Sequence, residues 1–116
     1  MIADSKGEYM SLDKNRLLIE LSKTIRDINY DIINPSISTL NVEGLQPVLE
    51  LVARARAAYI KNMHDLATDV GDGLPNKKQL ENLKASRELF EEVLSGAQAL
   101  EAAVERGYLD VSSRKK

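Results

Sequence analysis

The side chains that most often bind metals are scarce in this chain, which has one histidine and no cysteine. His64 has Lys61 three residues before it, where a di-metal helical bundle has a glutamate. The segment Asp69–Gly73 resembles part of a calcium loop, but glycines stand at two ligand positions and Leu80 replaces the bidentate glutamate. The sequence therefore predicts no metal and no cofactor, and we expect His64 at the surface.

Arg56 is the charged residue that most needs a partner, because it lies in an apolar, alanine-rich stretch. If the segments on either side of residues 71–76 pair as antiparallel helices, three glutamates lie level with it: Glu88, Glu91 and Glu92. Three interpretations follow. Arg56 forms an ion pair with one of these glutamates, forms an ion pair across a subunit interface, or binds an anionic ligand together with Tyr59.

The residue patterns of common catalytic sites are missing from the sequence. No Ser/His/Asp set, pair of inward carboxylates or glycine-rich nucleotide loop is visible. Other charges pair at the helical spacing of four, as Lys61 does with Asp65, which is typical of solvated faces. The sequence favours a non-enzymatic protein; the alternative is a small helical enzyme or ligand-binding bundle that uses Arg56 for an anionic ligand.

Three segments, at about 12–33, 47–70 and 77–106, have apolar residues at alternating spacings of three and four, which places them on one side of a helix. In the first segment the expected core face consists of Leu18, Leu21, Ile25, Ile28 and Ile32. We predict an all-α fold: an antiparallel three-helix bundle of helical hairpins with coiled-coil-like packing, completed by oligomerisation.

Residues that favour helix ends support the predicted limits of the second and third helices. Pro47 suits the first turn of the second helix, and Gly71 suits a left-handed stop after it. Asn76 and Gln79 have the spacing of a capping box at the start of the third helix. Gly107 predicts a Schellman motif at its end.

A second, narrower apolar line on the first helix is formed by Leu12, Ile19 and Tyr30. These residues lie on one line along the helix, because their separations are near multiples of 3.6. That line is roughly opposite the expected core face. They are either scattered surface side chains or a contact surface. We predict that they form an interface together with Arg56, either in a homodimer or with another protein.

Length and composition set the remaining expectations. The chain has 116 residues and a net charge of -2, with 43% hydrophobic and 29% charged residues. We expect a flexible lead over residues 1–10, a single helical domain over 11–110 and a basic flexible tail over 111–116. No secretory signal and no apolar run of about 20 residues is present. The sequence predicts a cytoplasmic interaction protein, an adaptor or regulator, with no membrane partner; the charge balance disfavours nucleic acid.

Overall fold

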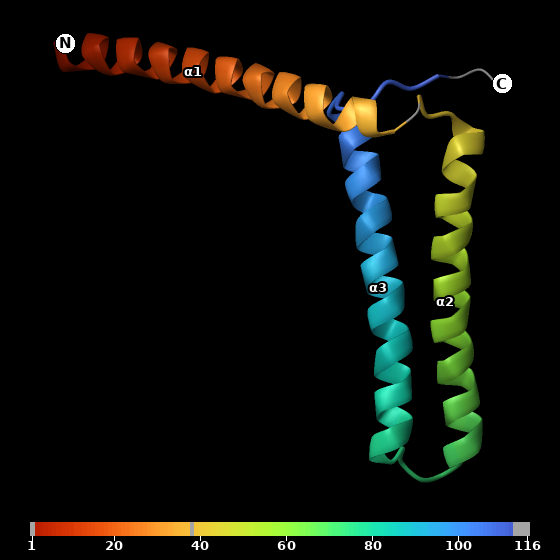
Figure 1. The fold of residues 1–116 in the computed structure, drawn as a ribbon. Helices are drawn as coiled ribbons and strands as arrows, with labels where there is room; N and C mark the ends of the chain where they lie inside the picture. Colours follow the sequence, from red (N-terminus) through yellow and green to blue (C-terminus); the bar gives the residue numbers. More distant parts are fainter. Residues whose placement is uncertain (1, 38, 113–116) are drawn as a thin grey trace. The chain divides into compact units, whose positions relative to one another are not determined.

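Three α-helices and one short 3-10 helix make up the computed structural model, which describes residues 2–37 and 39–112, with side chains from residue 11 onward (Figure 1). Over these residues there is no β-strand, and the all-α prediction is confirmed. The elements are α1 (Ile2–Ile33), η1 (Asn34–Ser36), α2 (Val42–Val70) and α3 (Lys77–Glu105).

The chain divides into two compact units. Unit 1 combines Met1–Thr39 with Ala103–Val111, and unit 2 combines Leu40–Ala102 with Ser112–Lys116. The last turn of α3 therefore belongs to unit 1, and the rest of that helix belongs to unit 2. The basic tail that the sequence predicts lies, from residue 113 onward, outside the described residues.

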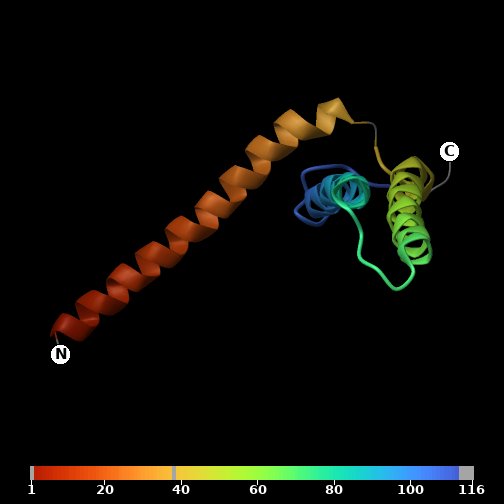
Figure 2. The ribbon, with the colours of Figure 1, turned by 90° about the horizontal axis from the view of Figure 1, so that it is seen from below.

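Unit 2 is built on a helical hairpin in which α2 and α3 lie side by side and run in opposite directions (Figures 1 and 2). Gly71 ends α2 with a φ of 57°, a left-handed conformation that favours glycine. The predicted capping box begins α3: the Gln79 N–H donates to Asn76 Oδ1 and the Asn76 N–H donates to Gln79 Oε1, both at 2.9 Å. The buried hairpin residues are Val52, Ala55, Leu66 and Ser86.

Two helices begin earlier than the sequence predicted. α1 is helical from Ile2, where a non-helical lead was expected, because adding residues to an existing helix costs less than nucleating a new one. α2 begins at Val42, and Pro47 lies inside the helix. The cap of α2 is Asn41, whose side chain accepts from the Gly44 N–H at 2.8 Å. Pro47 was therefore wrong as the starting residue.

In unit 1, the end of α3 closes in the predicted Schellman motif. Gly107 has a φ of 76°, its N–H donates to the Val104 carbonyl, and the Tyr108 N–H donates to the Ala103 carbonyl at 2.8 Å. This turn buries Leu109. The absent side chain of Gly107 also leaves room for the stem of Arg26, whose Cδ would lie 3.5 Å from a Cβ at this position.

Candidate functional site

The most extended exposed feature of unit 1 is a row of aliphatic side chains on α1. We call it the α1 stripe, and it consists of Leu18, Leu21, Ile25, Ile28 and Ile32. These residues are between 44% and 68% exposed. The sequence predicted them as a buried core face, whereas unit 1 itself leaves them open, because the contacts of α1 with residues 103–111 involve other residues, such as Arg26 and Tyr30.

The second apolar line of α1 is not a uniform surface. Leu12 and Ile19 are 65% and 71% exposed, as a contact surface requires. Tyr30 is half-buried, and its hydroxyl already has a partner within unit 1. The structure therefore leaves Leu12 and Ile19 available for a partner and gives Tyr30 a contact inside the chain as well.

Tyr30, Asn34 and Asp110 form a polar cluster in unit 1. The Tyr30 hydroxyl donates to the Asp110 carboxylate at 3.0 Å, and Asn34 Nδ2 donates to it at 3.2 Å. In return, the Asp110 N–H donates to Asn34 Oδ1 at 2.9 Å. The hydrogen bond to Asp110 is the main cause that raises the pKa of Tyr30, followed by burial and the nearby negative charges of Asp110 and Asp31.

Sequence reasoning missed this cluster. Asp110 is separated from Tyr30 by 80 positions and from Asn34 by 76, so no local spacing links them. The expected Schellman turn at Gly107 was the one signal that the chain folds back after α3. It did not indicate which residue of α1 lies nearby.

Arg56 in unit 2 has an aromatic neighbour. Its Cζ lies 5.3 Å from the centre of the Phe90 ring, and the Tyr59 ring lies 6.2 Å from the same ring. A guanidinium over an aromatic face at this distance is a cation–π contact. Within the described part of the chain no ion pair of Arg56 is found, and the predicted glutamate pair is replaced by this contact. The structure thus brings Arg56 and Tyr59 together on one ring.

Two grooves of unit 2 carry acidic groups. Arg56 lines a groove of about 460 Å³ that also contains Glu101 and is otherwise mainly aliphatic. The three glutamates that were expected to pair with Arg56 line a separate groove with Ser95. Glu101 lines the same groove as Arg56, and its negative charge opposes the binding of an anion there. This arrangement disfavours the ligand-binding alternative.

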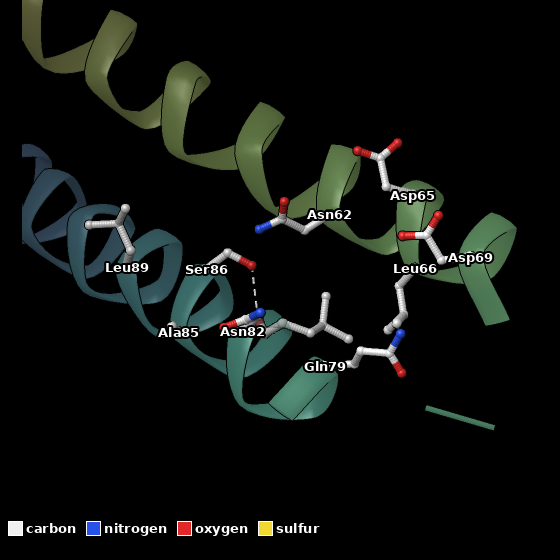
Figure 3. A pocket seen from close by; sticks show the side chains of 10 residues that line it. Asn62, Asp65, Leu66, Asp69, Gln79, Asn82, Ala85, Ser86 and Leu89 are labelled. Atoms are coloured by element: carbon white, nitrogen blue, oxygen red, sulfur yellow. Dashed lines mark hydrogen bonds between the residues drawn. The ribbon is translucent and has the colours of Figure 1, made fainter. Parts of the chain in front are cut away.

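A groove of unit 2 lies between α2 and α3 near their connecting turn, with a volume of about 560 Å³ (Figure 3). The only buried polar side chain among the described residues, Ser86, lies in it and donates to the Leu83 carbonyl at 2.9 Å. Its hydroxyl is therefore engaged within its own helix and is not poised as a nucleophile. The other polar residues that line the groove are Asn62, Asp65, Asp69, Gln79 and Asn82.

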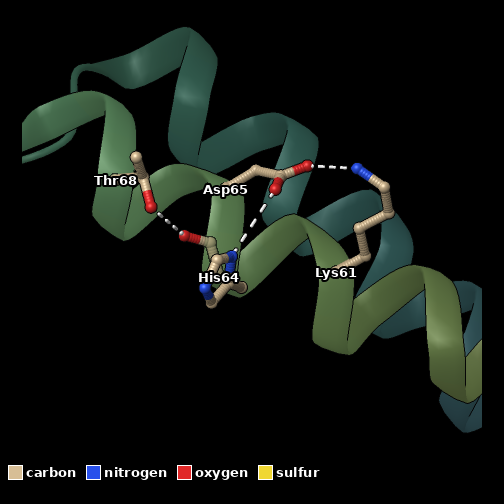
Figure 4. A network of polar contacts seen from close by, with 4 residues as sticks. All are labelled: Lys61, His64, Asp65 and Thr68. Atoms are coloured by element: carbon tan, nitrogen blue, oxygen red, sulfur yellow. Dashed lines mark hydrogen bonds and ion pairs between the residues drawn. The ribbon is translucent and has the colours of Figure 1, made fainter.

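A network on the exposed side of α2 contains the one histidine (Figure 4). Lys61 Nζ lies 2.6 Å from Asp65 Oδ2, which confirms the predicted pair, and His64 Nδ1 lies 3.7 Å from Asp65 Oδ1. The hydrogen bond from Lys61 is the main cause that lowers the pKa of Asp65 and, in return, raises that of Lys61. The His64 side chain is 82% exposed, as expected for a surface residue. Among the described residues no group of three or more His, Cys, Asp or Glu side chains could hold a metal.

Comparison with known proteins adds no assignment: no family model, curated protein or solved structure matches the chain. In the part of the chain that the structure describes, none of the helices has an apolar stretch that could span a bilayer.

Proposed function

We propose that this chain is a non-enzymatic helical interaction protein that acts as a homo-oligomer, in its simplest form a dimer, in the cytoplasm. The observation that carries the proposal is the exposed α1 stripe. Five large aliphatic side chains that follow one another on one side of a helix differ from single apolar residues scattered over a surface. Continuous apolar patches of this kind are typical of protein–protein contacts. Burying a half-exposed Leu or Ile side chain contributes about 1 kcal/mol, so two stripes together offset a substantial part of the cost of association.

The small core supports the same proposal. No large side chain among the described residues is fully buried, and the buried apolar residues are few. A chain of this size without disulfides gains stability from oligomerisation when its own core is small. In the proposed oligomer the α1 stripe and the hairpins complete an antiparallel helical bundle with coiled-coil-like crossings.

A second copy of the chain suits the α1 stripe because the residues beside it are mostly uncharged. Ser22, Thr24 and Asn29 flank the middle of the stripe, and Asp31 flanks its end at Ile32. When two identical helices pair, like charges at flanking positions meet and repel, and these neutral residues avoid that repulsion. The exposed Leu12 and Ile19 on another side of α1 then remain for a protein that the oligomer binds as an adaptor or regulator.

Sedimentation equilibrium tests the proposal. We expect the wild-type chain to form dimers or larger species, and the double variant Ile25→Gln/Ile28→Gln to shift toward the monomer. A matched control, Ile60→Gln/Leu74→Gln, removes two exposed apolar side chains from unit 2, which are 60% and 90% exposed. A wild-type chain that stays monomeric and helical at high concentration would contradict self-association.

The alternative is a ligand-binding bundle that uses Arg56 and Tyr59 for an anion. A thermal-shift series with small anions distinguishes the two proposals. Stabilisation of the wild-type chain that disappears in Arg56→Met would favour the alternative. A lower unfolding temperature in Arg56→Met without any anion effect fits a structural contact with Phe90.

A further inference from the structure

Unit 1 contains a groove of about 500 Å³ whose charged lining is entirely basic. Lys23 and Arg26 come from α1, and Arg106 is the residue that follows α3. Ser22 and Tyr108 add two hydroxyl groups, and Ile25 adds an apolar side chain. The groove therefore places three cations around one small space in a chain whose net charge is -2.

The three cations are weakly neutralised by the protein. Arg26 Nη2 lies 3.5 Å from Asp27 Oδ1, a long contact between two side chains that are more than half exposed. Among the described residues neither Lys23 nor Arg106 has an ion pair with a carboxylate. Charges of one sign that line a groove raise the local concentration of ions of the opposite sign.

The backbone of the Schellman turn helps to hold the basic groove in place. The stem of Arg26 lies against Gly107, the residue that follows Arg106, and Tyr108 is half-buried beside them. Arg26 and Arg106 are thereby kept on one groove, although 80 positions separate them in the sequence. A stem that is already in contact loses less entropy when the guanidinium of Arg26 binds an anion.

We propose that this groove binds a small molecule with a diphosphate group. Guanidinium groups form paired hydrogen bonds with phosphate oxygens, and three cations match the several negative charges of a diphosphate better than the single charge of a carboxylate. The volume lies within the range of small-molecule sites. The proposal rests on the basic side chains and not on self-association, although the groove shares Ile25 with the α1 stripe and Ser22 with its flank.

Calorimetric titration of the full chain with sodium pyrophosphate at low salt tests this site. We expect Lys23→Gln/Arg106→Gln to weaken binding by about tenfold or more, since each charge-assisted hydrogen bond contributes appreciably to affinity. The control Arg54→Gln/Lys78→Gln lowers the net charge equally in unit 2 and is expected to bind like the wild type. Circular dichroism checks that both variants keep their helices.

Several outcomes would overturn the proposal. One is the absence of pyrophosphate binding; another is an equal loss of affinity in both double variants, which would indicate a general charge effect. Citrate that binds as tightly as pyrophosphate would show that the groove does not select phosphate. Co-sedimentation with phosphatidic acid vesicles, without binding of free pyrophosphate, would assign the groove to a lipid headgroup instead.

Discussion

The hydrogen bond between Tyr30 and Asp110 gives the clearest pH-dependent property of single residues in this chain. The neutral phenol donates to the carboxylate, whereas a phenolate would be repelled by it, so the pKa of Tyr30 is raised above its ordinary value of 10.0. We predict that Asp110→Asn lowers the pKa of Tyr30 toward that value. Titration of ¹³C-labelled tyrosine by NMR measures this pKa directly.

The raised pKa also sets the sign of a stability effect. The folded chain holds the Tyr30 proton more tightly than the unfolded chain does, so the contribution of this group is fully present below pH 10.0 and is lost as the pH rises through the raised pKa. A Tyr30 pKa that is the same in the wild type and in Asp110→Asn would show that the hydrogen bond is not formed in solution.

The contact of Arg56 with Phe90 predicts a measurable coupling between these two residues. In a double-mutant cycle with Arg56→Met and Phe90→Leu, we expect a coupling of about 0.5–1 kcal/mol in the free energy of unfolding, typical of an exposed cation–π pair. Urea unfolding of the four chains provides the values. If a cycle with Arg56→Met and Glu92→Gln showed the coupling instead, the result would support the ion pair that the sequence suggested.

At the scale of helices, the capping box at the start of α3 predicts the cost of a single substitution. Asn76→Ala removes the oxygen that accepts from the Gln79 N–H, and we expect a loss of about 1 kcal/mol in the free energy of unfolding. Thermal or urea unfolding measures it. Asn76→Asp serves as a control, because aspartate caps equally well; equal destabilisation by both substitutions would contradict the cap.

Helix ends that are set by residues close by in the sequence could be predicted. A helix end for which two nearby residues each favour a different starting position could not. Asn76 with Gln79 and the glycine at 107 act through residues three to five positions apart, and the structure contains both motifs. The start of α2 was misplaced because Pro47 is a strong local signal, although Asn41 caps the helix earlier. Local preference alone does not rank two nearby starts.

At the scale of the whole molecule, the all-α class could be predicted because spacings of three and four recur along most of the chain. The partners of particular side chains could not be predicted in the same way. Tyr30 contacts Asp110 across 80 positions, and Arg56 lies on an aromatic ring where an opposite charge was expected. The same periodicity marks an apolar face without showing what covers it, so it could not indicate that the α1 stripe is exposed within unit 1.

Cross-linking through one introduced cysteine tests most directly whether two copies meet along the α1 stripe, because the chain has no cysteine of its own. Thr24→Cys places a thiol between Leu21 and Ile28, and Thr68→Cys places a matched thiol on the exposed side of α2. We predict that, under mild oxidation, Thr24→Cys forms a disulfide-linked dimer much faster than Thr68→Cys does. Equal rates for the two variants, as random collisions give, would contradict the account.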